Sequence, residues 1–366
     1  MVNGVDGVDG ATVCVVLGTS EGGVGAHVRV LAGRLVNRGA DVVVCGPAAT
    51  QQLFDFTSTG ARFAAVPIAR GFEPLSDRRA VGLVRAQIAG ADVVHAHGLR
   101  AGYVAVRAAR GRVPVVVTWH NALLGGGVKR RVQAWIERRI ARGATLNLAV
   151  SSDLVARITS LGGRGVLAPV GATRLTGGAP SADGVRDQLG VGDERIVLAV
   201  GRLHPQKGFD ILVDAAARLS GTALVLIAGD GPQRDELQQR IDSSGAPVRL
   251  LGRRDDVPQL LAAADVVVMP SRWEGSPLAA HEAMLAGRPL IAAAVGGLPD
   301  LAAGDAIHLV PSEDAAALAA AIEHLLGDPA YAAELAERGA ARAREWPDGN
   351  ASADAVIAAY AELLRR

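Results

Sequence analysis

Cysteine, lysine and aromatic residues are scarce in this chain of 366 residues, and the scarcity of cysteine and of aromatic residues argues against several classes of protein. Phe, Trp and Tyr make up 3% of the residues, too few for the stacked aromatic platforms that bind single-stranded nucleic acids. The formal net charge is +1, so no basic field indicates a nucleic-acid-binding protein. Two cysteines, Cys14 and Cys45, belong to apolar runs, which predicts buried thiols rather than disulfides or metal ligands.

Long apolar runs are also missing. No segment approaches the ~18 uninterrupted apolar residues of a membrane-spanning helix. Residues 1–13 contain neither a basic start nor a long apolar segment, so they do not resemble a secretory signal. We therefore expect a cytoplasmic protein.

Almost all basic residues of this chain are arginine rather than lysine. Of 38 basic residues, only Lys129 and Lys207 are lysine. Since arginine serves almost everywhere else, a lysine in a loop beside other polar residues is a candidate for a chemical role.

Short β-branched runs alternate with helical patterns along most of the chain. Fully apolar strands between helices are typical of a parallel sheet covered on both faces. The predicted strands are 12–17, 42–45, 62–67, 92–96, 114–118, 146–150 and 165–168, followed by 195–200, 223–228, 247–251, 265–269, 289–293 and 306–310.

This pattern predicts an α/β protein with two facing, doubly wound, Rossmann-like domains and an interdomain cleft. The N-terminal domain is predicted over 1–172 and the second domain over 186–345. Between them, residues 173–185 are rich in Gly, Ala, Ser and Thr, and we interpret them as a linker. Residues 346–366 are helical in pattern.

Two glutamates flank a predicted helix start in the second half. After the strand that ends at Met269, Ser276 is a plausible N-cap and Pro277 fits the first helical position. The positive end of such a helix suits a diphosphate. Glu274 before the helix and Glu282 inside it are suited to hydroxyl groups of a substrate, although both fit ordinary surface carboxylates equally well.

Two cations follow another strand end. Arg202 and Lys207 lie in the loop after Val200, where they would stabilise the charge on a diphosphate leaving group. The alternative is two solvated loop charges, which the rarity of lysine disfavours for Lys207. Gly229, in the Gly-Asp-Gly turn after the next strand, allows close approach of a ligand but also fits a plain turn.

A glycine-rich loop with Gly22 and Gly23 joins the first strand to the first helix, where backbone N–H groups can face a ligand. Its spacing is G-x-x-x-G-G-x-G, whereas dinucleotide-binding enzymes have G-x-G-x-x-G. The second strand also ends without the carboxylate that binds a ribose. A dinucleotide-dependent oxidoreductase is therefore disfavoured.

Three histidines end neighbouring strands. His95 and His97 end the fourth strand and His120 ends the fifth, so all three should face the carboxyl side of the sheet. No carboxylate or cysteine accompanies them at metal-ligand spacing, so we expect no metal. His120 is the stronger candidate for contact with a substrate; the alternative is a histidine hydrogen-bonded within the fold.

Residues 128–142 form a basic amphipathic pattern. Val132, Trp135, Ile136 and Ile140 make one apolar stripe among six basic positions, which are Lys129, Arg130, Arg131, Arg138, Arg139 and Arg142. Two interpretations stay open: a surface helix packed on its sheet, or a helix that contacts an anionic membrane surface.

Together these motifs resemble the retaining glycosyltransferases of family 4, within the glycosyl transferases of group 1. The resemblance depends on Gly-Arg-x₄-Lys-Gly at 201–208, Gly-Asp-Gly-Pro at 229–232 and Glu-x₇-Glu at 274–282. The segments LAGRLVNRGADVVV and DVVHAHG in the first half are also similar, so that the likeness spans roughly residues 12–345.

The resemblance implies a GT-B fold and a nucleotide diphosphate sugar as donor. It implies that Arg202 and Lys207 bind the diphosphate, that Glu282 holds the ribose and that Glu274 contacts the transferred sugar. Beside them would lie the backbone near Gly275, Ser276, Pro277 and Leu278.

On the acceptor side, the resemblance places His120 beside the reacting sugar and Gly22 and Gly23 along the acceptor and phosphate loop. It implies retention of configuration by front-side attack, no metal and no cofactor. Residues 346–366 would form a helix that crosses back to the N-terminal domain.

The sequence also departs from the family pattern. Residues 168–173 read Ala-Pro-Val-Gly-Ala-Thr where an Asn-Gly-Val-Asp-like turn is common, and Ser276 replaces a common aromatic residue. The acceptor, the donor base and the sugar therefore stay open. A nucleotide-sugar epimerase and a non-catalytic sugar-nucleotide-binding protein are the alternatives on the same fold.

Overall fold

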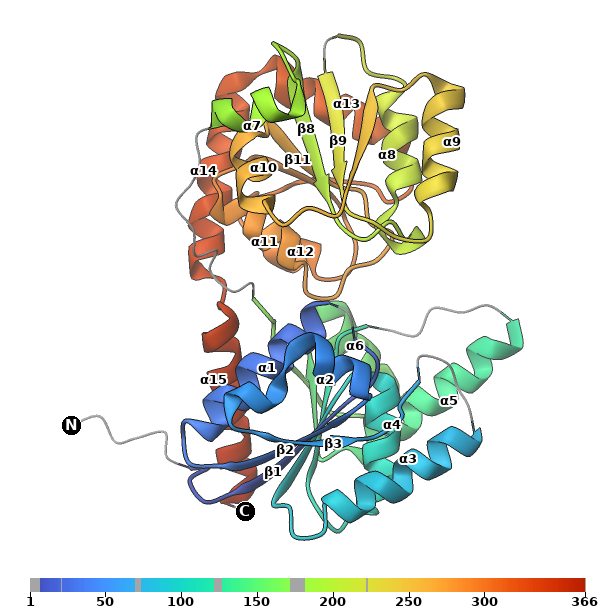
Figure 1. The fold of residues 1–366 in the computed structure, drawn as a ribbon, viewed down its shortest axis with the longest axis vertical. Coiled ribbons are helices and arrows are strands. Elements are labelled where there is room, and N and C mark those ends of the chain that lie inside the picture. Colours follow the sequence, from blue (N-terminus) through green and yellow to red (C-terminus); the bar gives the residue numbers. More distant parts are fainter. Residues whose placement is uncertain are drawn as a thin grey trace, which may run out of the picture. The chain divides into compact units, whose positions relative to one another are not determined.

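The chain forms two compact units in a computed structural model, which describes residues 7–365 except for 21, 70–73, 122–126, 172–181 and 222 (Figure 1). The first unit combines Met1–Val170 with Pro347–Arg366, and the second is Gly171–Trp346. The C-terminal segment therefore belongs to the same unit as the N-terminal half.

Within the described residues, the first unit is built on a seven-stranded parallel sheet in the order β3-β2-β1-β4-β5-β6-β7. Its strands are β1 (Thr12–Leu17), β2 (Asp41–Gly46), β3 (Arg62–Ala65), β4 (Val93–His97), β5 (Val115–Trp119), β6 (Leu146–Ala149) and β7 (Gly165–Leu167). The helices around it are α1 (Gly23–Val36), α2 (Ala48–Phe54), the short η1 (Phe56–Thr59), α3 (Pro74–Gln87), α4 (Leu99–Ala109), α5 (Gly127–Gly143), α6 (Ser152–Ser160) and α15 (Gly349–Leu364).

The described part of the second unit has a six-stranded parallel sheet in the order β10-β9-β8-β11-β12-β13. Its strands are β8 (Arg195–Val200), β9 (Ala223–Ala228), β10 (Val248–Gly252), β11 (Val266–Met269), β12 (Leu290–Ala293) and β13 (His308–Val310). Its helices are α7 (Ala182–Leu189), the short η2 (Pro205–Lys207), α8 (Phe209–Ala216), α9 (Arg234–Ser244), α10 (Val257–Ala263), α11 (Leu278–Leu285), α12 (Leu298–Leu301), α13 (Ala315–Gly327) and α14 (Pro329–Glu345).

The predicted fold class is confirmed, since both units are doubly wound, Rossmann-like α/β folds. Every predicted strand is present, and the inner strands β1, β4 and β5 are apolar and buried along most of their length, as expected for a sheet covered on both faces. In each sheet the chain first winds outward in one direction and then in the other, with the reversal between β1 and β4 and between β8 and β11. Ligands of such sheets bind beside this reversal, at the carboxyl ends of the strands.

The linker prediction needs a correction at its C-terminal end. Residues 173–181 lie outside the described part of the chain, but residues 182–185 belong to helix α7. Val185 of that helix is buried in the core of the second unit. The helix was not predicted because this segment is rich in small residues and its packing depends on the buried Val185.

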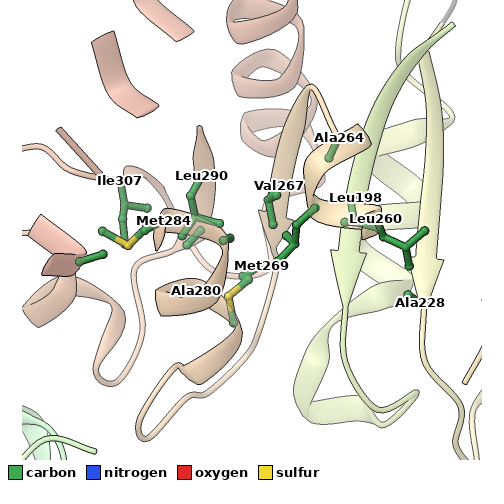
Figure 2. Close-up of a cluster of buried hydrophobic side chains, with 14 of the residues drawn as sticks. Leu198, Ala228, Leu260, Ala264, Val267, Met269, Ala280, Met284, Leu290 and Ile307 are labelled. Atoms are coloured by element: carbon green, nitrogen blue, oxygen red, sulfur yellow. The ribbon is translucent and has the colours of Figure 1, made fainter. Parts of the chain in front are cut away.

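The core of the second unit fixes helix α11 beside its sheet (Figure 2). Ala280 and Met284 of α11 pack with Met269 of β11 and Leu290 of β12, and all four side chains are buried. Burying a Leu or Met side chain stabilises the fold by about 1.5–3 kcal/mol. The start of α11 is thus held next to the end of β11, where Glu274 lies.

Helix α15 is fastened to α1 by an ion pair. The Arg34 guanidinium donates two hydrogen bonds of 2.6 Å to the Asp354 carboxylate, and Arg38 lies 2.9 Å from the same group. Tyr360, further along α15, is fully buried and contacts His95 of β4. The C-terminal helix therefore forms part of the first unit's core.

Candidate functional site

Two loops of the second unit meet where its sheet reverses. One follows β8 and the other follows β11, and hydrogen bonds join them: the backbone amide of Arg272 donates to the carbonyl of Gln206 at 2.8 Å. The Gln206 side chain donates to the carbonyl of Trp273 at 2.9 Å. Because β8 and β11 are parallel neighbours, residues almost 70 positions apart in sequence lie side by side at this end of the sheet.

Lys207 and Glu274 form an ion pair across these loops. Lys207 Nζ lies 2.5 Å from Glu274 Oε1, and the Ser271 hydroxyl donates to the same oxygen at 2.6 Å. Glu274 is only 5% exposed, so it is not an ordinary surface carboxylate. No described residue bonds its second oxygen, Oε2, so that oxygen can accept a further hydrogen bond.

The sequence did not indicate Ser271 or the loop after β12. The amide of Gly297 donates to the carbonyl of Glu274 at 3.1 Å. At Gly296, with φ of 55°, an added Cβ would lie 1.7 Å from that same carbonyl oxygen. Only glycine fits there, and the Gly-Gly pair after a strand was the available signal.

Gly229 has the same kind of requirement. Its φ is 156°, and a Cβ would lie 1.8 Å from the carbonyl oxygen of Gly201. The turn after β9 thus packs tightly against the loop after β8, in which Arg202 lies exposed. The close packing of this turn is therefore enough to require glycine at position 229.

Helix α11 begins one residue later than predicted. Pro277, rather than Ser276, is the N-cap, and no side chain within the described residues caps the helix. The reason is local: the amide of Leu278 bonds the carbonyl of Ser276 at 2.9 Å and tightens the loop. An N-terminus without a side-chain cap keeps N–H groups available to an anion, beside the buried Gly275.

Glu282 lies one turn into α11 and is half-buried. Burial raises its pKa, and no described residue forms an ion pair or hydrogen bond with it. A half-buried carboxylate without a partner among these residues is suited to accept hydrogen bonds from neutral hydroxyl groups.

In the first unit, the glycine-rich loop leads into α1. Gly22 is the N-cap and is exposed, as is Gly23. A Cβ at Gly22 would meet nothing within 4 Å, whereas one at Gly25 would lie 2.2 Å from the ring of Phe54. Gly25 is therefore the glycine that the packing requires, and Gly22 borders open space.

Four histidines gather beside this loop at the ends of β4 and β5. His97 Nδ1 lies 3.2 Å from His120 Nε2, while His95 bonds the Thr118 hydroxyl at 2.7 Å and the Tyr360 hydroxyl. His27 of α1 completes the cluster and was missed, because its helical position fits a core residue. His95 thus has a partner within the fold for each ring nitrogen, and His120 is hydrogen-bonded to His97.

Burial keeps these rings neutral. It lowers the pKa of His27 to about 4 and that of His120 to about 3, and it holds the pKa values of His95 and His97 well below the usual range. No group of three or more His, Cys, Asp or Glu side chains in the described part of the chain is arranged to hold a metal. At neutral pH, the cluster offers hydrogen bonds rather than charge.

Helix α5 presents a mixed surface. Ile136 and Ile140 are buried, but Trp135 is 52% and Val132 is 44% exposed, so the predicted apolar stripe is only partly packed. A surface hollow of about 540 Å³ is lined by Trp135 and a group of arginines, namely Arg110, Arg138, Arg139 and Arg142. The side chains of Lys129 and Arg130 lie outside the described part. No helix within the described ranges is long and apolar enough to cross a membrane.

Comparisons with known proteins agree with this architecture. The model of the "Glycosyl transferase 4-like domain" matches residues 22–171, and that of the "Glycosyl transferases group 1" matches residues 194–328. The D-inositol 3-phosphate glycosyltransferase of Mycobacterium tuberculosis is 30% identical over 92% of this chain and 72% of its own length. The alpha-D-kanosaminyltransferase of Streptomyces kanamyceticus is 33% identical, and this match spans about half of each protein.

Solved structures show the same fold. The sucrose-phosphate synthase of Thermosynechococcus elongatus superimposes with a TM-score of 0.81 at 25% identity, covering 97% of this chain and 99% of the other. HepE from Anabaena, in complex with UDP and glucose, gives 0.79 at 24% identity, covering 94% and 98%. The matches confirm the resemblance drawn from the motifs: the chain belongs to the group 1 glycosyltransferases, resembles glycosyltransferase family 4 and has the GT-B fold.

Proposed function

We propose that this glycosyltransferase moves a sugar from a nucleotide diphosphate sugar to an acceptor hydroxyl, with retention of configuration and without a metal. The observation that carries the proposal is the cluster of Lys207, Glu274 and Ser271 where the second sheet reverses. It combines a cation for phosphate with a carboxylate oxygen for a sugar hydroxyl.

The donor is proposed to lie along this end of the sheet. Arg202, Lys207 and the start of α11 would stabilise the diphosphate, since all three provide positive charge or N–H groups. Glu274 would bind the transferred sugar through Oε2, and Glu282 would bind the ribose. The backbone from Gly275 to Leu278, and Gly229 after β9, would lie beside the phosphates.

The reaction is a substitution at the anomeric carbon. The acceptor oxygen forms a bond to that carbon on the face from which the nucleoside diphosphate leaves, while the bond to the phosphate oxygen breaks. The acceptor proton passes to the departing phosphate, so no protein nucleophile and no metal is required. Positive charge near the leaving phosphate lowers the barrier, because negative charge develops there in the transition state.

His120, Gly22 and Gly23 are proposed to face the acceptor and the reacting sugar from the first unit. His120 is half-buried and neutral, so it would form a hydrogen bond with a substrate rather than an ion pair. Gly22 borders open space, which gives a bound group room beside the loop.

A thermal-shift series tests the donor first. UDP, GDP, ADP and their common sugars are compared in a buffer with EDTA, because a ligand that binds only the folded chain raises Tm with its occupancy. HepE holds UDP and glucose, so UDP-glucose is the first probe. We expect a shift for one nucleotide series; no shift for any nucleotide would contradict the donor site.

The acceptor test uses the same donor with D-inositol 3-phosphate, because a relative that matches 92% of this chain is named for that compound. Formation of a glycoside whose NMR spectrum shows the donor's anomeric configuration would support retention. Conversion of the sugar nucleotide to an epimer in the absence of any acceptor would favour an epimerase. Tight binding without turnover would favour a non-catalytic protein.

We also propose that helix α5 contacts an anionic membrane surface, with the protein on the cytoplasmic face. Trp135 and Val132 are exposed beside Arg131, Arg138 and Arg139, a combination that suits the interface of an anionic bilayer. The wild type should sediment with phosphatidylglycerol vesicles and not with phosphatidylcholine vesicles. Replacing Arg138 and Arg139 by serine should abolish this binding; unchanged sedimentation would remove the proposal.

A further inference from the structure

The histidine cluster divides into two parts with different partners. His95 uses both ring nitrogens inside the fold, one on Tyr360 and the other on Thr118. His97, whose ring centroid lies 4.1 Å from that of His95, has one hydrogen-bond partner within the described residues, and that partner is His120. Only this second part reaches a residue that the proposed function uses.

We propose that His97 is a positioning residue for His120: it holds His120 through Nε2 and leaves Nδ1 as the single ring nitrogen that a substrate hydroxyl can meet. The inference rests on the proposed function, because that function brings a substrate to His120. His97 itself is 3% exposed and would not touch the substrate.

Protonation makes the two rings interdependent. Each neutral imidazole carries one proton, so in the His97–His120 bond one nitrogen donates and the other accepts. If His97 donates, the proton of His120 lies on Nδ1; if His97 accepts, it lies on Nε2. The bond therefore couples the two rings, and His120 cannot change between donor and acceptor toward a substrate unless His97 changes with it.

The ring of His27 packs against both members of the pair. The ring of His27 meets that of His97 edge-on at a centroid distance of 5.5 Å and that of His120 at 6.1 Å. His27 is 4% exposed, and neither of its nitrogens has a partner within the described part of the chain. It packs against the two rings and forms no hydrogen bond with either of them.

Two variants of nearly equal size isolate the hydrogen bond. In His97→Asn, the side-chain amide lies where Nδ1 of the histidine lay, so it can still bond His120. In His97→Leu, the shape is similar but the bond is lost. With histidine-selective ¹⁵N labelling of the full chain, long-range ¹H–¹⁵N spectra report which nitrogen of His120 carries the proton.

In the wild type, we expect the Nε2 signal of His120 to have the ¹⁵N chemical shift of a nitrogen hydrogen-bonded to His97. His97→Leu should move this signal, and His97→Asn should restore it. The His95 signals serve as an internal control, because its bonds to Tyr360 and Thr118 must persist if the fold is intact. An unchanged His120 pattern in a folded His97→Leu variant would overturn the proposal.

Kinetics provide the second readout. With UDP-glucose as donor and water as acceptor, UDP release by His97→Leu should have a kcat at least tenfold below that of the wild type, with little change in KM. His97→Asn should recover most of this loss, and an equal loss in both variants would contradict the positioning role. If His120→Asn keeps full turnover, the proposed function of His120 fails, while the nitrogen spectra still decide whether His97 fixes the ring.

Discussion

The two units differ in the polar groups near the carboxyl ends of their strands: those of the second unit are charged, and those of the first are neutral. In the second unit, a lysine and a glutamate are paired at 2.5 Å beside an uncapped helix start. In the first unit, four histidines are neutral because burial lowers their pKa values. Similar sheets thus support different chemistry: full charges suit a diphosphate, and neutral rings suit hydroxyl groups.

The largest effect should come from breaking the charged pair. If the proposed donor site is right, Glu274→Gln and Lys207→Ala should each lower turnover of UDP-glucose at least a hundredfold, because each would remove a charge proposed to position the donor or to stabilise its leaving group. Steady-state kinetics of purified variants measure this, with melting curves to separate folding from catalysis. Near-native turnover in either variant would refute the role assigned to that residue.

Lowering the pH should destabilise the first unit through protonation of His27. Its pKa is near the ordinary 6.5 when unfolded and about 4 when folded, so the unfolded chain takes up a proton first and stability falls as the pH drops below about 6.5. At about 1.4 kcal/mol for each pH unit, this one ring should lower the free energy of unfolding by about 2 kcal/mol between pH 7 and pH 5.

Hydrogen exchange of the β4 amides at several pH values measures this loss within the first unit. In His27→Leu, the contribution of this ring to the pH dependence should disappear. The same slope in wild type and variant would mean that His27 does not cause the acid sensitivity. The charge of His27 is also one cause of the lowered pKa values of His97 and His120, which face it, so their contributions should become smaller in the variant.

Tyr360→Phe tests how the neutral cluster depends on the C-terminal helix. It removes the hydroxyl that bonds His95 and leaves a buried ring nitrogen unpaired, which should cost about 1–3 kcal/mol. Tyr331→Phe is the matched control, because its hydroxyl bonds the half-buried His308 at 3.1 Å. Urea denaturation should show a clearly smaller loss in the free energy of unfolding for the control. Equal losses would mean that the His95–Tyr360 bond stabilises the fold no more than the His308–Tyr331 bond.

The sequence correctly predicted the strands and the positions of candidate residues in the loops that directly follow them. Lys207 and Glu274 were identified because each follows an apolar strand, and parallel strands place their ends together. Ser271, His27 and Tyr360 were not, since their roles depend on contacts between distant elements that no local pattern encodes. The start of α11 was misplaced by one residue because a backbone bond in the loop overrides the preference of Ser276 as a cap.

The smallest effect should come from an ion pair that resembles Lys207–Glu274 only in distance. Arg240 and Asp214 also lie 2.5 Å apart, but their side chains are 42% and 39% exposed. Water screens such a pair, so Arg240→Ala should change the free energy of unfolding by less than about 1 kcal/mol and leave turnover unaltered. A loss as large as that of Lys207→Ala would mean that charge pairing as such, rather than its burial where the sheet reverses, makes the donor-side cluster important.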